Sequence, residues 1–200
     1  MPFCTGISKA NNFLYLYIIS DYKIICFGDS NTKRHRDRLL EILPETELIT
    51  CYTLEEMLEE ISVIQEDYYD ICIIHILTND VKNICQKDWS YPDKKMELLF
   101  LVEDYVHMIK NLIWKYPNLK IFISMVLSRF DGLDKLAISN GNDFVNVEIS
   151  KQLCRENHVI LMSNDHLKES AFDHKKFHLT KAGFDIMCKK WRSEIDNIFS

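Results

Sequence analysis

Lys23-Ile24-Ile25-Cys26-Phe27-Gly28-Asp29-Ser30-Asn31-Thr32 is the stretch that decides the fold. It begins with a short run of β-favouring apolar residues, and a charged, helix-favouring run follows its Gly-Asp-Ser-Asn turn. The pattern predicts a buried strand, a tight turn and a helix. Because the carboxyl ends of parallel strands open into the ligand crevice of an α/β sheet, this turn would present Ser30 where chemistry can occur. The backbone N–H of Ser30, near a helix N-terminus, would also be able to meet a developing anion.

Strand-like and helix-like segments alternate along the rest of the chain. The expected later strands are 47–50, 70–76, 120–126 and 159–162, and the expected helices are 34–43, 54–64, 93–116, 143–157 and 180–198. Such alternation is typical of a doubly wound α/β protein. We therefore expect a single three-layer α/β/α sandwich, flavodoxin-like, with a parallel sheet of about five strands. It would occupy residues 23–200, after an N-terminal extension over residues 1–22.

The composition limits the classes of function. The net charge of −6 argues against a protein that binds nucleic acid over its whole surface, although a local basic patch stays compatible with it. The seven cysteines form no C-x-x-C pair and several lie in apolar runs, so we expect a reduced, cytoplasmic protein. The apolar run 13–19 is too short for a membrane span, and an edge strand, an extension or a degenerate secretion signal are its open interpretations. We expect neither a metal nor a cofactor.

Two further stretches fall on the same predicted edge of the sheet as Ser30. Leu77-Thr78-Asn79-Asp80 ends the strand 70–76, and Phe177-His178-Leu179-Thr180 precedes the last helix. A nucleophile, an oxyanion donor and a base would meet there as Ser30, Asn79 and His178. Each residue by itself also has a structural explanation, as a helix cap, a turn former and an ordinary histidine. Only their joint order points to a site. His75, within the third strand, is expected to be a core histidine.

These residues resemble the sequence blocks of the SGNH, or GDSL-type, hydrolase family. The first block of the family, Gly-Asp-Ser, is matched by Gly28-Asp29-Ser30, and the third, Gly-x-Asn-Asp, is similar to Leu77-Thr78-Asn79-Asp80. The last block, Asp-x-x-His, is similar to Lys175-Lys176-Phe177-His178, so the resemblance covers residues 23–198. It implies a serine esterase that acts on a small ester.

In that esterase, His178 would take the proton of Ser30, whose Oγ would attack the ester carbonyl to form an acyl-enzyme. The resemblance implies that the oxyanion is held by the backbone N–H of Ser30 and the side-chain amide of Asn79, with the N–H of Cys51 as a third candidate.

Three positions depart from the family pattern. Cys51 and Leu77 stand where the family has glycine, and Lys175 stands where it has the Asp that orients the histidine. Asp173, two residues earlier, is the alternative orienting carboxylate. Loss of one oxyanion donor typically costs roughly 100- to 1,000-fold in turnover, and a histidine without a fixed tautomer costs up to about 10,000-fold.

A basic run beside Ser30 supports a competing hypothesis. It contains Lys33, Arg34, Arg36 and Arg38, at the start of the first expected helix, where cations oppose the helix dipole. An ordinary solvated helix face is one interpretation, and a patch for phosphates or RNA is the other. The non-catalytic, RNA-binding domain of the Oskar germ-plasm proteins resembles this chain in its lost glycines and its basic residues near the first helix, although this chain keeps Ser30, Asn79 and His178. The esterase-like domains of some non-LTR retrotransposons also resemble it. The alternatives to an esterase are therefore a catalytically inactive RNA-binding protein and a protein-interaction module.

Overall fold

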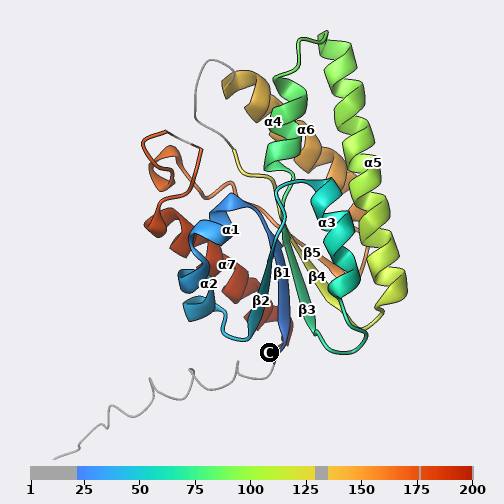
Figure 1. The fold of residues 1–200 in the computed structure, drawn as a ribbon, viewed down its shortest axis with the longest axis vertical. Coiled ribbons are helices and arrows are strands. Elements are labelled where there is room, and N and C mark those ends of the chain that lie inside the picture. Colours follow the sequence, from blue (N-terminus) through green and yellow to red (C-terminus); the bar gives the residue numbers. More distant parts are fainter. Residues whose placement is uncertain (1–21, 129–134, 176, 200) are drawn as a thin grey trace, which may run out of the picture.

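A computed structural model describes residues 22–128, 135–175 and 177–199. In this part of the chain, five parallel strands form one sheet in the order β2-β1-β3-β4-β5 (Figure 1). Their bounds are β1 Ile24–Gly28, β2 Thr46–Thr50, β3 Ile71–His75, β4 Lys120–Ser124 and β5 Val159–Met162. The chain reverses its direction across the sheet between β1 and β3, which makes this pair the topological switch point where α/β folds bind ligands.

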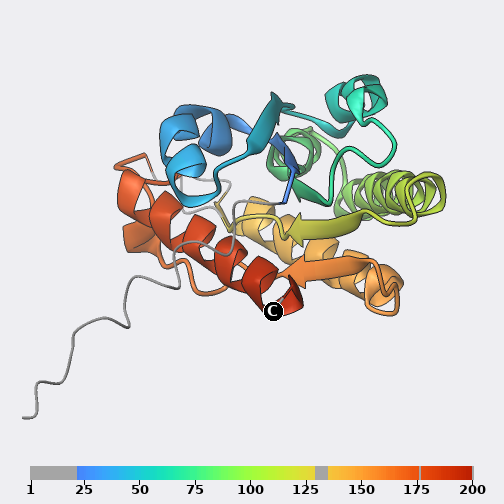
Figure 2. The same ribbon diagram turned by 90° about the horizontal axis from the view of Figure 1, so that it is seen from below.

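Helices cover both faces of the sheet (Figure 2). One face carries α1 (Ser30–Arg34), α2 (Arg36–Ile42) and α7 (Lys181–Phe199). The other carries α3 (Leu54–Glu60), α4 (Thr78–Cys85), α5 (Tyr91–Lys115) and α6 (Lys135–Leu153). Two short 3-10 turns, η2 (Ile61–Val63) and η3 (Glu169–Ala171), complete the described elements. The expected three-layer sandwich with a parallel sheet is confirmed.

Alternate residues of each strand face opposite helical layers. Ile25 and Phe27 of β1 lie in the cluster under α3 to α6, whereas Ile24 and Cys26 lie in the cluster under α2 and α7. Both faces of the central strands are therefore buried, which explains why these strands are almost continuously apolar.

The expected helix 34–43 is wrong in one respect, because the structure divides it into α1 and α2 at His35. The backbone of His35 leaves the helical region at φ −113° and ψ 28°. Its ring contacts the ring of Phe184 in α7, with centroids 4.8 Å apart, and its Nε2 bonds the carbonyl of Leu179 at 2.9 Å. A tertiary contact thus interrupts a locally helical sequence.

One further helix, α4, was not expected, and two elements have other ends than expected. Helix α6 begins at Lys135 instead of residue 143, and β4 ends at Ser124 instead of residue 126. Helix α7 begins at Lys181, and Thr180 caps it, since its Oγ1 accepts a hydrogen bond from the N–H of Gly183 at 3.0 Å.

The extension expected over residues 1–22 lies outside the described residues, apart from Tyr22. The ring of Tyr22 packs on Phe199 at the end of α7, with ring centroids 4.3 Å apart. Among the described residues, no helix is both long and apolar enough to cross a membrane.

Candidate active site

Ser30 is the first residue of α1 and directly follows the turn that ends β1. The cap of this helix is Asp29, whose carboxylate accepts the N–H of Asn31 at 2.8 Å, so Ser30 is not the capping residue. Gly28 is required because a Cβ there would lie 2.2 Å from Thr32 Oγ1. The turn is therefore stabilised by the bond between Asp29 and Asn31, and the Ser30 hydroxyl is left for other contacts.

His178 lies opposite Ser30. Its Nδ1 is 3.4 Å from Ser30 Oγ, although the two residues are 148 positions apart in the chain. The imidazole is half-buried and packs on the ring of Phe177, with centroids 4.1 Å apart. The separation is somewhat longer than the roughly 2.6–3.2 Å of a catalytic hydrogen bond, as is common for nucleophile–base pairs without substrate.

The loop that carries His178 is held by the helix that carries the nucleophile. The N–H of Leu179 donates to the Oδ1 of the buried Asn31 at 2.8 Å, and the Nε2 of His35 donates to the Leu179 carbonyl at 2.9 Å. We call Asn31 and His35 the clamp. Both polar groups of the Leu179 backbone are thus engaged, which restricts where the preceding histidine can point. The sequence contains no local signal for this arrangement.

Asp173 also contacts this loop. Its carboxylate accepts the N–H of Lys175 at 3.1 Å and lies 3.7 Å from Nη1 of Arg34. Burial raises the pKa of this carboxyl, but the backbone N–H groups of His178 and Phe177 outweigh it and hold the pKa below its usual range. These contacts let Asp173 shape the turn in which His178 lies, while Lys175 is exposed.

Asn79, the candidate oxyanion donor, is half-buried at the second position of α4. Its Nδ2 donates to the carbonyl of Tyr52 in the loop between β2 and α3 at 3.1 Å. A side-chain amide carries two N–H donors, so this bond uses one of them. The geometry brings Asn79 to the same sheet edge as Ser30 and ties it to the neighbouring loop.

The expectation that the N–H of Cys51 serves the oxyanion is wrong. This N–H donates to the carbonyl of Gly28 at 3.0 Å, where it continues the pairing of β1 with β2. The next N–H, that of Tyr52, donates to Glu56 Oε2 at 2.5 Å. The Cys51 thiol is buried as well, and burial raises its pKa to about 11, so it stays protonated at neutral pH.

Leu77 has a backbone that glycine would adopt more easily. Its φ of 79° lies in the left-handed region, which costs a residue with a Cβ about 1–2 kcal/mol. Its side chain is only 2% exposed and belongs to the same hydrophobic core cluster as Val81. Leu77 therefore combines a left-handed backbone with a buried side chain.

A chain of buried polar side chains lies beneath the nucleophile turn. His75 Nδ1 is 3.0 Å from Ser124 Oγ, and its Nε2 is 3.7 Å from the carboxylate of Asp29. Asn164 continues the chain by donating to Ser124 Oγ at 3.0 Å and to the Met125 carbonyl. Burial lowers the pKa of His75 more than Asp29 raises it, which keeps the ring neutral. The interpretation of His75 as a core histidine agrees with this, but its partners were not predicted.

The arginines of the basic run form ion pairs within the protein. Arg38 donates to both oxygens of Asp185 in α7, at 2.6 and 3.0 Å, and also pairs with Glu41. Arg34 faces Asp173 instead. Arg34 and Arg38 belong to two helices separated by the break at His35, and both line one surface hollow.

The remaining cations of the run point to solvent or to an aromatic side chain. Lys33 donates to the hydroxyl of Tyr52 at 3.0 Å, and Arg36 is exposed beside Lys181 at a surface hollow of about 540 Å³. With its two other arginines paired to carboxylates, the run offers phosphates less positive charge than the sequence indicated.

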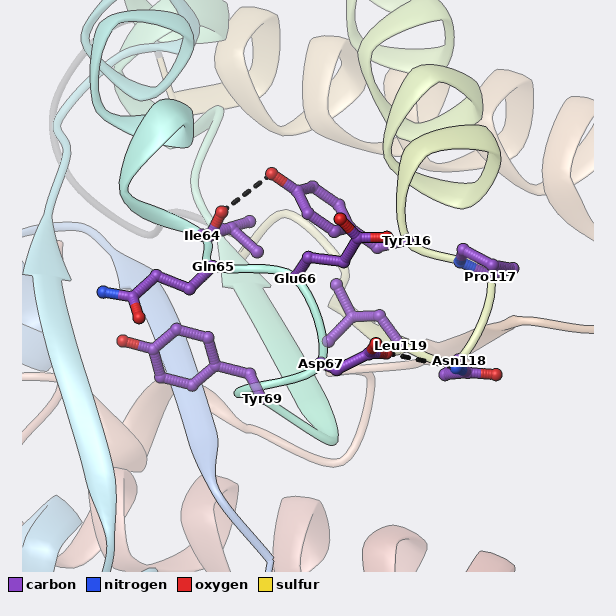
Figure 3. A pocket seen from close by; sticks show the side chains of 9 residues that line it. All are labelled: Ile64, Gln65, Glu66, Asp67, Tyr69, Tyr116, Pro117, Asn118 and Leu119. Carbon is purple, nitrogen blue, oxygen red and sulfur yellow. Dashed lines mark hydrogen bonds between the residues drawn. The ribbon is translucent and has the colours of Figure 1, made fainter.

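A cavity of about 80 Å³ lies at the end of the sheet opposite the candidate site, between the loops that precede β3 and β4 (Figure 3). There Tyr116 donates to the carbonyl of Ile64 at 2.8 Å. The described residues contain no group of three or more His, Cys, Asp or Glu able to hold a metal ion.

The sequence matches no family model and no curated protein. Solved structures with the same fold include a protein assigned as an acylhydrolase from Bacteroides fragilis, at 13% identity and a TM-score of 0.67, covering 90% of this chain and 89% of that one. A GDSL-like lipase from Bacteroides thetaiotaomicron is 14% identical with a TM-score of 0.65, over 88% and 89% of the chains. Phospholipase A1 from Streptomyces albidoflavus is 12% identical with a TM-score of 0.60, over 86% and 98%. The chain therefore has the fold of the SGNH/GDSL-type hydrolases.

Proposed function

We propose that this chain, built on the fold of the GDSL-type hydrolases, is a serine esterase that transfers the acyl group of a small ester to Ser30. The observation that carries the proposal is the distance of 3.4 Å between Ser30 Oγ and His178 Nδ1. The two residues come from opposite ends of the domain sequence and meet at the carboxyl ends of the strands, where ligands of this fold class bind.

In the proposed reaction, Nδ1 of His178 accepts the hydroxyl proton as Ser30 Oγ attacks the ester carbonyl. The alcohol leaves with that proton, and the acyl group stays on Ser30. Water then attacks the acyl-enzyme while His178 again takes a proton, which releases the acid and restores the serine.

The negative charge of the tetrahedral intermediate would be held by the backbone N–H of Ser30 and the amide of Asn79. The N–H of Cys51 is excluded because it pairs with Gly28. One donor fewer typically lowers turnover roughly 100- to 1,000-fold. We therefore expect a slow esterase that works best on esters with good leaving groups.

The clamp replaces part of what an aspartate at position 175 would do. An orienting carboxylate acts on the imidazole itself, whereas Asn31 and His35 fix the backbone beside it through the two bonds to Leu179. This limits the positions that the His178 ring can take.

Labelling with a fluorophosphonate probe tests the proposal, because such a probe reacts much faster with an activated serine than with an ordinary hydroxyl group. The wild-type protein should be labelled and the Ser30→Ala variant should not. Ser163→Ala is the matched control, since Ser163 is half-buried and follows β5 at the same sheet edge. Absence of labelling in folded wild-type protein, or undiminished labelling of Ser30→Ala, would show that the proposal is wrong.

A further inference from the structure

The helices α4, α5 and α6 pack against one another on one face of the sheet (Figure 1). A cavity of about 310 Å³, open to the surface, lies between them. Its walls are mostly apolar and include Cys85, Leu98, Phe144 and the ring of Tyr91. Its volume lies at the lower end of the roughly 300–1,000 Å³ of typical small-molecule sites. Ser30, Asn79 and His178 are not among the residues that line it.

The helices meet closely at one point and leave the cavity beside it. At Gly141 of α6, an added Cβ would lie 2.7 Å from the Sγ of Cys85 and 2.9 Å from a methyl carbon of Val81 in α4. Tyr91, at the start of α5, lines the cavity and yet is 77% exposed. A large aromatic side chain on the rim of an apolar cavity is typical of a surface that binds a ligand.

The charged groups among the described lining residues have one sign. Of the residues that the structure describes there, Lys94 and Lys95 are charged, and none is acidic. Lys94 Nζ donates to the carbonyl of Cys85 at 2.8 Å, so it is held at the end of α4, whereas Lys95 lies 5.6 Å from the centre of the Phe144 ring. The carboxylate of Glu97, on the same helix as these two lysines, forms an ion pair with Lys87, whose Nζ lies 3.8 Å from it. Two ammonium groups at an apolar cavity on a protein of net charge −6 complement a ligand with an anionic head.

We propose that this cavity binds a single-chain amphiphile with an anionic head, of which an alkyl carboxylate is the simplest example. The alkyl chain lies between Leu98 and Phe144, and the head meets Lys95 and Lys94 at the rim. An uncharged amphiphile of the same length fills the apolar part but lacks the ion pair. The site does not depend on the esterase proposal, because none of its residues takes part in the chemistry at Ser30.

The cavity is nevertheless close to the candidate active site. Asn79 is the second residue of α4 and Cys85 the last, so the two are separated by about 9 Å along the helix axis. A ligand in the cavity therefore contacts the helix that positions the candidate oxyanion donor.

Calorimetric titration of the full chain with decanoate and with decanol tests this inference. Decanoate should bind the wild-type protein, and the Lys94→Met/Lys95→Met variant should bind it at least about tenfold more weakly while its affinity for decanol changes less than about twofold. Lys110→Met is the matched control, because Lys110 is an exposed lysine of the same helix outside the cavity. It should leave both affinities unchanged.

Two more variants locate the ligand. Ala137→Phe places a ring in the cavity from an exposed position of α6 and should abolish binding of both compounds, with an unchanged melting temperature as the sign of an intact fold. Ser30→Ala should bind decanoate as the wild type does. The inference is wrong if the wild type does not bind decanoate, if the lysine variant binds it equally well, or if Ser30→Ala loses the binding.

Discussion

The two halves of the candidate active site differ in how their hydrogen bonds are directed. On the side of Ser30 and His178, the clamp of Asn31 and His35 joins two distant segments and brings a nucleophile and a base within 3.4 Å. On the side that would hold the oxyanion, the N–H of Cys51 faces β1, and one N–H of Asn79 faces the neighbouring loop.

This difference shows that a nucleophile–base pair and an oxyanion hole are separate structural requirements. The first needs two side chains and a rigid support, and the chain provides them. The second needs donors directed at a point in open space. Here the N–H of Cys51 pairs with Gly28 at the end of β1, and one N–H of Asn79 joins α4 to the loop after β2. We therefore expect Ser30 and His178 to form a working nucleophile–base pair, and the oxyanion half to stabilise the transition state poorly.

The largest expected effect comes from breaking the nucleophile half. His178→Gln removes the base and should lower the rate of fluorophosphonate labelling about 100- to 10,000-fold, the contribution of a general base. His174→Gln is the matched control, since His174 is exposed in the same loop and should label as the wild type does. Equal labelling of His178→Gln would remove His178 from the mechanism.

A second prediction concerns the oxyanion half. If Asn79 stabilises the oxyanion despite its bond to Tyr52, Asn79→Ala should lower the hydrolysis rate of an activated ester such as p-nitrophenyl acetate by roughly 100-fold or more. If the amide serves only to join the loops, the variant loses thermal stability and keeps its rate. That second result would show that the oxyanion half is structural.

The clamp gives a smaller effect that separates positioning from stability. Asn31→Ala leaves the N–H of Leu179 unpaired and lets the His178 loop move, which should slow labelling on the order of 10- to 100-fold. Asn142→Ala is the control, because Asn142 is also a buried asparagine with a backbone partner, the Leu127 carbonyl, but lies in α6. Both variants should melt at lower temperature, and only Asn31→Ala should label more slowly. Equal labelling rates would reduce the clamp to a structural contact.

The smallest effect is one of pH, at the junction of the two loops on the oxyanion side. Burial raises the pKa of Asp80 to about 6, more than its bond from the N–H of Leu54 lowers it. The folded protein thus holds this proton more readily than the unfolded chain. The free energy of unfolding therefore falls as the pH rises from the ordinary pKa of an Asp towards 6, and this loss of stability disappears as the pH is lowered.

Asp80→Asn should therefore be more stable than the wild type at pH 7 by about 1–3 kcal/mol, and the difference should shrink as the pH is lowered from 7 to 4. Urea denaturation at several pH values measures it. A difference that stays constant with pH would mean that Asp80 does not titrate in this range.

Much of the fold was predictable because it depends on local patterns. The strands around Ile25, Ile73 and Phe122 are short apolar runs with helical segments between them, and this alternation is sufficient for a parallel sheet. The unexpected break at His35 and the early start of α6 were not predictable in the same way. At His35, contacts with residues 144 and 149 positions away decide the backbone conformation.

For the candidate site, the sequence by itself determined that Ser30, Asn79 and His178 reach one edge, because the carboxyl ends of parallel strands share that edge whatever the details of packing. It also contained the three departures from the family pattern. Only the tertiary structure decided how the departures act: that Leu77 has a left-handed backbone, and that Cys51 directs its N–H into the sheet. The physical reason is that a hydrogen bond depends on the direction and distance between two groups, and for groups far apart in the chain these are set only when the elements pack.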